Sequence, residues 1–379
     1  MRKFNGSICA KVENRISNGR FNCGGYSLTE SRHGGNIYDN EIELDFSVNV
    51  NPKKIPDSLK KAMEQSINYA DTYPDIHCRK LREKIAEYHG VNCEHIVCGN
   101  GASELLMAIV HGEKPKRILL MAPSFLGYEY VADAVSSEII FYDLKRENGF
   151  VVEEDFLGWI DEKIDMAILA SPNNPTGLCI DRELLVKIVD KCKKYDVTVL
   201  LDECFIELST HFEKSMINEI EMFDNLIVLR AFTKSFAIPG VRLGYLVCSN
   251  KNKLAGIKRQ LPEWNVSVMA QAVGIAALEE KDYLDKSRKH ILDEKKYLIK
   301  ELETLGFEVI NSDANYLLFY CKTDLYKELL MRGILIRNCD NYRGLKKGFL
   351  RVAVKRHEEN IKLINAIKEI NETNKIIIR

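Results

Sequence analysis

Residues 165–203 read DMAILASPNNPTGLCIDRELLVKIVDKCKKYDVTVLLDE. The segment opens and closes with short apolar runs, at 165–170 and 197–201, and residues 182–195 between them carry apolar side chains at helical spacing. Two apolar strands joined by a helix make a βαβ unit, in which the strands are parallel and buried on both faces. This segment therefore predicts an α/β fold.

The same alternation extends outward in both directions. Further apolar runs lie at 117–122, 138–142, 226–229 and 243–248. Because helical stretches separate these runs, we predict one mostly parallel sheet within a large domain at residues 70–270.

The pattern changes after about residue 281, where a long charged helix is predicted up to Gly306. Short strands and helices then alternate in the way that is typical of a smaller α+β domain. We expect residues 33–69 to join residues 271–379 in this domain. Residues 1–32 lack a sustained period and are expected to form a loosely ordered extension.

Composition and charge exclude several classes of protein. The chain has 379 residues, of which 46% are hydrophobic and 29% charged, as in ordinary globular proteins and unlike disordered ones. Its net charge of −1 gives no bulk attraction to nucleic acid or to an anionic membrane. We expect neither as a partner, and any anionic ligand must be held by a local arrangement of residues.

The cysteines and the apolar runs bear on the cellular compartment. Eleven cysteines are scattered along the chain without a CxxC pair, which favours reduced thiols over a disulfide framework. No apolar run approaches the ~18 to 20 residues of a membrane span, and the N-terminal region carries no signal-peptide core. We expect a cytoplasmic protein.

The motif SPNNPTG at 171–177 directly follows one of the predicted strands. Ligands of α/β sheets bind beyond the carboxyl ends of the strands, so the side-chain amides of Asn173 and Asn174 are placed to meet one. A simple turn is the alternative, because Asn, Pro and Gly favour turns in any case.

The next predicted strand ends in LLDE, and Lys234 follows 32 residues after Asp202. Taken singly, Asp202 could be a metal ligand or a helix cap, and Lys234 could be a solvated lysine. Together with SPNNPTG they are specific, because a pyridoxal-phosphate site requires a lysine for the Schiff base and a carboxylate that keeps the pyridine nitrogen protonated. We expect no metal site.

Two further segments are candidates for phosphate binding. Residues 98–104, CGNGASE, precede an apolar, helix-like stretch, and their small side chains would let backbone amides face an anion at a helix N-terminus. A plain loop with a helix cap is an equal alternative. Arg242, eight residues after Lys234, is a second candidate phosphate ligand.

From about residue 33 to 370, the order of NNPTG, Asp202, Thr-Lys and RLGY resembles the fold-type I pyridoxal-phosphate enzymes of the class I and II aminotransferase superfamily. The resemblance implies that the large domain binds pyridoxal 5'-phosphate, with Lys234 in the Schiff base and Asp202 at the pyridine nitrogen. It implies that Asn174 contacts the 3-oxygen of the cofactor or the substrate carboxylate. The other cofactor contacts that it implies are the phosphate ligands Thr233, Arg242, Gly101 and Ala102 and the ring-stacking Phe125.

The resemblance also implies a homodimer, in which Tyr73 of the motif DTYPD reaches the cofactor phosphate of the neighbouring subunit. Two positions depart from the pattern of the superfamily. Ala231 stands three residues before the lysine, where relatives often have Ser, and Phe205 stands where histidinol-phosphate aminotransferases usually have Tyr. The hydroxyl and the phenol of those relatives have no counterpart at these positions.

Four motifs resemble the threonine-phosphate decarboxylases of cobalamin biosynthesis: HGGNI at 33–37, DFSVNVNP at 45–52, LIRNCDNYRGL at 335–345 and FLRVAV at 349–354. The resemblance assigns Arg337 to the substrate phosphate and Arg351 to the substrate carboxylate. The other substrate-binding residues that it implies are His33, Gly34, Asn49 and Asn174. On the residues alone, His33 could equally be a surface histidine, and both arginines could be solvated charges at strand ends.

The implied activity is decarboxylation of O-phospho-L-threonine, or of O-phospho-L-serine, to aminopropanol phosphate or ethanolamine phosphate. The same residues could run a transamination if the Cα–H bond stood perpendicular to the cofactor ring, because geometry selects the bond that breaks. An aminotransferase for histidinol phosphate or a similar phosphorylated amine is therefore the enzyme alternative. A cofactor-bound protein that serves binding or regulation is the alternative from another class.

Overall fold

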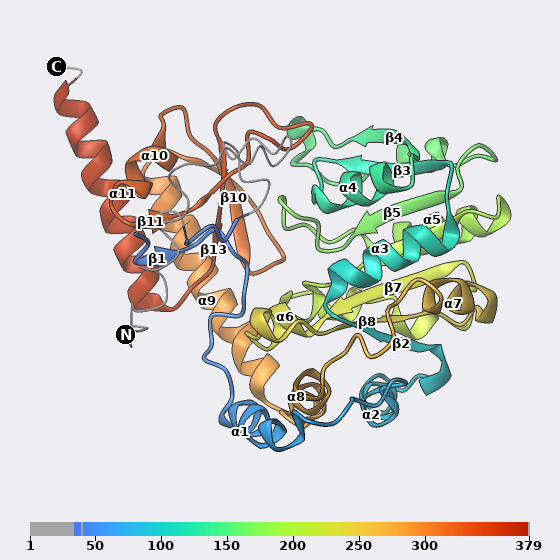
Figure 1. The fold of residues 1–379 in the computed structure, drawn as a ribbon. Helices are drawn as coiled ribbons and strands as arrows, with labels where there is room; N and C mark the ends of the chain where they lie inside the picture. Colours follow the sequence, from blue (N-terminus) through green and yellow to red (C-terminus); the bar gives the residue numbers. More distant parts are fainter. Residues whose placement is uncertain (1–33, 39–40, 378–379) are drawn as a thin grey trace, which may run out of the picture. The chain divides into compact units, whose positions relative to one another are not determined.

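A seven-stranded sheet occupies the middle of the chain in the computed structural model, which describes residues 34–38 and 41–377 (Figure 1). β8 runs antiparallel to both of its neighbours, and the strands from β7 to β4 run parallel to one another. The predicted α/β class is confirmed. The order of the strands is β2 (Ile96–Gly99), β8 (Gly244–Val247), β7 (Leu226–Ala231), β6 (Thr198–Asp202), β5 (Met166–Ala170), β3 (Arg117–Ala122) and β4 (Glu138–Asp143).

Both faces of this sheet are buried. Successive residues of the central strands point to opposite faces, so that on β5 Leu169 packs into one hydrophobic cluster and Ile168 into another. The amphipathic helix α5 (Arg182–Lys194) contributes Leu185 to the first cluster. α3 (Ala102–Glu113) contributes Leu105 to the second. Helices on both faces explain why the strands read as continuous apolar runs in the sequence.

Other helices surround the sheet, and α1 and α2 both pack on α8. In the described part of the chain, none of the helices is both long and apolar enough to cross a membrane. The bounds of these helices are α1 (Asp57–Ser66), α2 (Arg79–His89), α4 (Gly127–Ala134), α6 (Phe232–Ser235), α7 (Lys251–Lys258) and α8 (Val268–Leu278).

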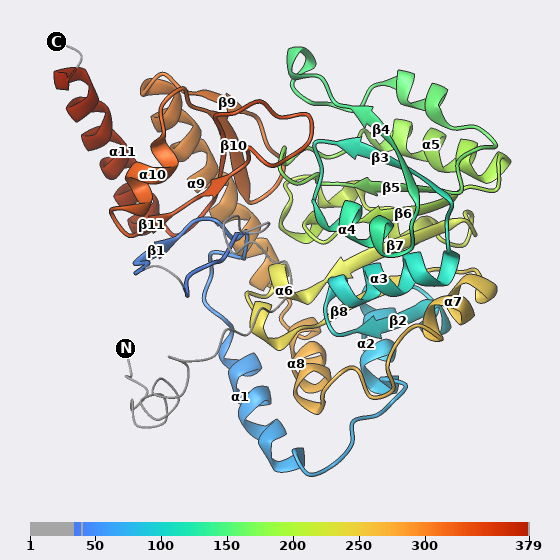
Figure 2. The same cartoon turned by 45° about the horizontal axis from the view of Figure 1, so that its top comes forward.

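The C-terminal part of the chain builds two smaller sheets. A four-stranded antiparallel sheet has the order β12 (Arg337–Asn338), β13 (Phe349–Ala353), β10 (Tyr316–Tyr320) and β9 (Glu308–Ile310). Figure 2 shows α9 and α11 beside this sheet, and the two helices contact each other. The remaining elements are the parallel pair β1 (Leu44–Asp45) and β11 (Ile334–Leu335), and the helices α9 (Tyr283–Thr304), α10 (Leu325–Leu330) and α11 (His357–Ile377).

The segment around β1 belongs with the C-terminal part of the fold. Phe46 packs in the same hydrophobic cluster as Leu317 of β10 and Leu363 of α11. From Gly34 onward the chain forms one compact unit, and the division into a domain at 70–270 and a smaller one stays a prediction. The expected extension at residues 1–32 lies outside the described residues.

Candidate active site

Three neighbouring parallel strands end at the same edge of the large sheet, and each is followed by a predicted site residue. Asn173 and Asn174 follow β5, Asp202 closes β6, and Lys234 lies in the short helix α6 after β7. β6 pairs with both β5 and β7, so the three strand ends are adjacent. Asp202 and Lys234 therefore lie at the same edge of the sheet, after adjacent strands.

The carboxylate of Asp202 accepts two hydrogen bonds. Tyr128 of α4 donates its hydroxyl to Oδ2 at 2.7 Å, and the amide of Cys204 donates to Oδ1 at 2.9 Å. Burial raises the pKa of Tyr128 well above its ordinary value, and the charge of Asp202 adds to this effect, so the phenol stays a donor. Sequence analysis missed Tyr128, although it lies only three residues after Phe125 in the sequence PSFLGY at 123–128.

Lys234 is half-buried, and its Nζ lies 5.9 Å from the ring centroid of Phe205. Burial lowers the pKa of Lys234 below its ordinary value, and the positive charges of Arg351 and Arg242 lower it further, against the opposing effect of Asp202. A lowered pKa increases the fraction of neutral amine, which is the form that attacks a carbonyl carbon. The lysine is therefore suited to covalent chemistry.

The segment that contains Asn49 and Asn51 is hydrogen-bonded to the backbone around Lys234. The amide of Asn51 donates to the carbonyl of Lys234 at 3.0 Å, and its side chain donates to the carbonyl of Ser235 at 2.7 Å. Two residues earlier, Asn49 is 3% exposed, and among the described residues no group donates to its Oδ1. A buried acceptor without a donor costs about 1 to 3 kcal/mol. Asn49 is thus suited to a ligand that brings a donor.

Gly101 and Arg242 form an anion cradle at the N-terminus of α3. Gly101 has a φ of +83°, and a Cβ there would lie 2.5 Å from Nη2 of Arg242. Glycine therefore lets the guanidinium approach the first helical turn, which begins at Ala102. Helix amides and a guanidinium are the donors that a phosphate group binds. Thr233, another implied phosphate ligand, is buried beside Lys234 in α6.

These groups fit pyridoxal 5'-phosphate. Lys234, with its lowered pKa, suits the aldehyde of the cofactor. The Asp202 carboxylate, which accepts two hydrogen bonds, suits the ring nitrogen, and the anion cradle suits the phosphate. Phe125 packs edge-to-face on Tyr128 with ring centroids 5.5 Å apart, which puts it in the same group of residues. The side chain of Tyr73 is 77% exposed, and its ring packs on Trp264.

Two arginines face each other on the four-stranded sheet. Arg337 of β12 pairs directly with Arg351 of β13 in antiparallel register, so both side chains lie on the same face of the sheet. Both arginines are buried, at 7% and 5% exposure. Like charges in opposed positions repel, and buried charges cost stability unless an opposite charge accompanies them. This arrangement suits a ligand that carries negative charge.

Polar groups of neighbouring loops contact the two guanidiniums. Arg351 donates through Nη1 to Oδ1 of Asn174 and through Nη2 to the carbonyl of Ser47 at 2.6 Å. Its Nε is buried and finds no acceptor in the described part of the chain. Arg337 donates to Oδ1 of Asn341 at 2.8 Å. Through the contact with Asn174, the smaller sheet meets the edge of the large sheet.

Tyr342 lies between these two arginine contacts. Its hydroxyl is 3.5 Å from Oδ1 of Asn174, and its ring centroid is 5.3 Å from Cζ of Arg337. Sequence analysis missed Tyr342, because a single aromatic residue in a sequence is most often a core residue. The signal that could have found it is its position in LIRNCDNYRGL, five residues after Arg337.

The glycines of the N-terminal motif lie directly on Ser47. A Cβ at Gly34 would overlap the carbonyl oxygen of Ser47, and the amide of Gly35 donates to Oγ of Ser47 at 2.7 Å. Because the same carbonyl accepts from Arg351, the glycine segment ends beside the arginine pair. His33, which was expected there as well, lies outside the described residues.

Comparison with known proteins places the chain in a wide group of enzymes. The family model for aminotransferase class I and II matches residues 41–367. The threonine-phosphate decarboxylase of Salmonella typhimurium is 34% identical over 356 residues, which cover 91% of this chain and 98% of that protein.

Solved structures agree with this placement. The histidinol-phosphate aminotransferase from Clostridium acetobutylicum has a TM-score of 0.82 at 32% identity, and the match covers 87% of this chain and 99% of that one. The L-threonine-O-3-phosphate decarboxylase from Porphyromonas gingivalis has a TM-score of 0.76 at 24% identity, with the same coverage of 87% and 99%. At that identity the second likeness shows the fold.

Replacing Gly101 tests the anion cradle. Gly101→Ala should weaken binding of pyridoxal 5'-phosphate by roughly 10- to 100-fold, because a hydrogen bond to a charged group contributes about 1.5 to 3 kcal/mol. Equilibrium titration of the cofactor-free protein measures this change. Gly90→Ala is the matched control, since Gly90 also has a positive φ, +69°, but has open space around its Cβ position. Equal losses of affinity in both variants would show that backbone strain, and not the cradle, is responsible.

Proposed function

The chain belongs to the family of class I and II aminotransferases, and we propose that it catalyses the decarboxylation of O-phospho-L-threonine to aminopropanol phosphate. The observation that carries this proposal is the opposed, buried pair Arg337 and Arg351, one of which contacts Asn174. Two cations in one site suit a substrate with two anionic groups, a carboxylate and a phosphate. O-Phospho-L-serine is the related substrate, since one methyl group gives only about 1 to 3 kcal/mol of discrimination.

The cofactor is pyridoxal 5'-phosphate. We assign Lys234 to its aldehyde carbon and Asp202 to its ring nitrogen, and we assign its phosphate to Gly101, Arg242 and Thr233. When bound, the cofactor supplies a protonated ring that withdraws electrons from the bond broken at the substrate Cα. Tyr128 keeps the Asp202 carboxylate in one orientation through its hydrogen bond.

Arg351 and Asn174 bind and orient the substrate carboxylate. They contact each other across the two sheets, so they define one position for an anion between the arginine and the cofactor loop. By fixing the carboxylate, these two residues would orient the bonds at the substrate Cα, and that orientation selects which bond breaks. We assign to Lys234 the return of a proton to Cα after the carboxylate has left.

Arg337 binds the substrate phosphate. Its planar guanidinium can donate to two phosphate oxygens at once, and Asn341 and Tyr342 hold it in place. We assign the remaining substrate contacts to His33, Gly34 and Asn49. This recognition separates the proposed enzyme from a decarboxylase of unphosphorylated amino acids.

We also propose a homodimer in the cytoplasm. Tyr73, Trp264 and Tyr69 are large, exposed side chains, and Tyr73 and Trp264 are in contact. An exposed aromatic group of this kind suits a second copy of the chain, to which Tyr73 would lend its hydroxyl for the cofactor phosphate. The cytoplasmic location is supported by the described cysteines, which carry free thiols.

The reaction itself tests the proposal. Incubation with O-phosphothreonine labelled in its carboxyl group should release labelled carbon dioxide and leave pyridoxal 5'-phosphate unchanged, because Arg351 and Asn174 present the carboxylate for departure. Lys234→Ala, the control, should release none. Stoichiometric conversion of the cofactor to pyridoxamine phosphate, together with a 2-oxo acid, would instead establish an aminotransferase for a phosphorylated amine, the alternative that the likeness to histidinol-phosphate aminotransferase favours.

Arg337→Ala tests how the phosphate is bound. Removing one partner of a buried, hydrogen-bonded charge pair costs about 2 to 5 kcal/mol, so kcat/KM for O-phosphothreonine should fall roughly 30-fold to several thousand-fold. Activity on unphosphorylated threonine should change little. The matched control is Arg343→Ala in the same loop, where the exposed Arg343 stacks on Phe141. An equal loss on both substrates would assign Arg337 to the carboxylate or to the fold.

A further inference from the structure

A turn of the four-stranded sheet is hydrogen-bonded to the loop that carries Asn174. The turn, residues 311–315, joins β9 to β10. The amides of Asp313 and Ala314 donate to the carbonyl of Gly177 at 2.8 and 3.1 Å, and the carboxylate of Asp313 accepts from the amide of Cys179 at 2.8 Å. The turn is therefore hydrogen-bonded to Gly177 and Cys179 of this loop.

The turn continues into the strand that lies beside Arg351. Tyr316 begins β10 and donates its hydroxyl to the carbonyl of Asn173 at 2.8 Å. Farther along β10, Leu318 is paired with Arg351 of β13. The turn thus connects to both residues of the Asn174–Arg351 contact. It reaches Asn174 through the loop after β5, and Arg351 through the pairing of β10 with β13. Its position sets how these two side chains meet.

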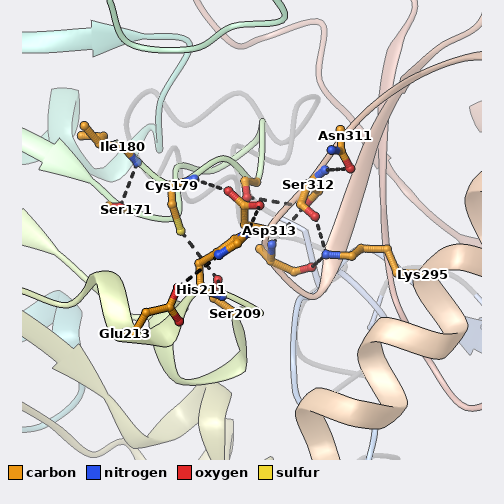
Figure 3. Close-up of polar contacts among 12 residues, drawn as sticks. Ser171, Cys179, Ile180, Ser209, His211, Glu213, Lys295, Asn311, Ser312 and Asp313 are labelled. Carbon is orange, nitrogen blue, oxygen red and sulfur yellow. Dashed lines mark hydrogen bonds and ion pairs between the residues drawn. The ribbon is translucent and has the colours of Figure 1, made fainter. Parts of the chain in front are cut away.

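Lys295 of α9 holds the turn from the inside. Its Nζ donates to the carbonyl of Ser312 and, at 3.4 Å, to the carbonyl of Ala314 (Figure 3). Lys295 is only 5% exposed. An ammonium group makes charge-assisted hydrogen bonds that are roughly twice as strong as those between neutral groups. A buried lysine that donates to the carbonyls on either side of Asp313 is well placed to fix the shape of the turn.

The charged groups around Lys295 lie on the turn and on the large-sheet side. Asp313 carries the charge that favours the protonated lysine, whereas burial raises the pKa of Cys179 to about 12 and leaves that thiol neutral. Figure 3 shows that Asp313 also faces His211, whose Nε2 lies 3.6 Å from its Oδ1, and that Glu213 is bonded to the other nitrogen of His211. Burial lowers the pKa of Lys295 to about 8, despite the attraction of Asp313.

We propose that Lys295 is a positioning residue, whose ammonium group holds residues 311–315 and through them keeps Asn174 and Arg351 in the geometry that the substrate carboxylate requires. This inference rests on the proposed function, because it concerns the same carboxylate site. It assigns a role to a lysine that touches neither the cofactor residues nor the arginine pair.

The direction of the pH effect follows from the lowered pKa. As pH rises through about 8, Lys295 loses its proton and its charge-assisted bonds, so kcat/KM should fall. The contribution of Lys295 to the free energy of unfolding should instead rise with pH. Between about 8 and the ordinary value of 10.5, the unfolded chain binds more protons than the folded one, and the contribution of Lys295 to stability rises with pH. A loss of activity caused by unfolding cannot show this pattern.

The test compares Lys295→Met and Lys295→Arg with Lys296→Met, a matched control at the exposed neighbouring lysine of α9. Lys295→Met should lower kcat/KM for O-phosphothreonine about 10- to 100-fold at neutral pH, because small displacements in an active site have effects of this size. The melting temperature of Lys295→Met should not fall. The decrease in kcat/KM that the wild type shows as pH rises through about 8, the pKa of Lys295, should be absent in this variant. Lys295→Arg, which stays charged, should restore most of the activity and give a flat profile in this range. The control should match the wild type.

Two outcomes would overturn the inference while the wild type remains an active decarboxylase. One is wild-type kcat/KM and pH dependence in Lys295→Met. The other is a parallel loss of activity and melting temperature that Lys295→Arg does not restore. A wild type that releases no carbon dioxide would overturn the proposed function instead. Lys295 is then judged from the Kd of O-phosphothreonine in cofactor-free protein, where Lys295→Met should still bind more weakly and wild-type affinity would overturn its role.

Discussion

Two buried guanidinium groups in opposed positions, Arg337 and Arg351, are the constraint on which the rest of this site depends. Burying each charge costs several kcal/mol after relaxation, and the repulsion between the two adds to that cost. A ligand with two anionic groups would return part of this free energy when it binds. Asn341 accepts a hydrogen bond from Arg337, and Asn174 and the carbonyl of Ser47 accept from Arg351.

The two sheets divide the work of the site. Three parallel strands of the large sheet deliver a lysine, a carboxylate and an amide to one edge, because parallel strands end at the same side. The antiparallel sheet delivers both arginines from neighbouring strands. The contact of Asn174 with Arg351 joins the two sets. It aligns the residues that we assign to the cofactor with those that we assign to the substrate, together with the turn behind it.

The sequence predicted the parts of this account that depend on local pattern. The apolar runs at 165–170 and 197–201 became β5 and β6, and Asp202 ends its strand as expected, because buried parallel strands are apolar throughout. Tyr128 and Tyr342 escaped prediction, since an aromatic residue near a helix or in a loop reads as core. Lys295 escaped for another reason: in a long charged helix a lysine is normally solvated, and only the contact with the turn at 311–315 reveals its burial.

The central claim is that the arginine pair is kept for an anionic substrate and not for the fold. The most direct test is the free energy of unfolding of cofactor-free Arg337→Met, measured with and without O-phosphothreonine. Without the ligand, the variant should be at least as stable as the wild type, because a buried charge opposed to Arg351 has been removed. The ligand should stabilise the wild type much more than the variant. A loss of about 3 to 5 kcal/mol in the variant without ligand would contradict the claim, because it would show that the arginine serves the folded structure itself.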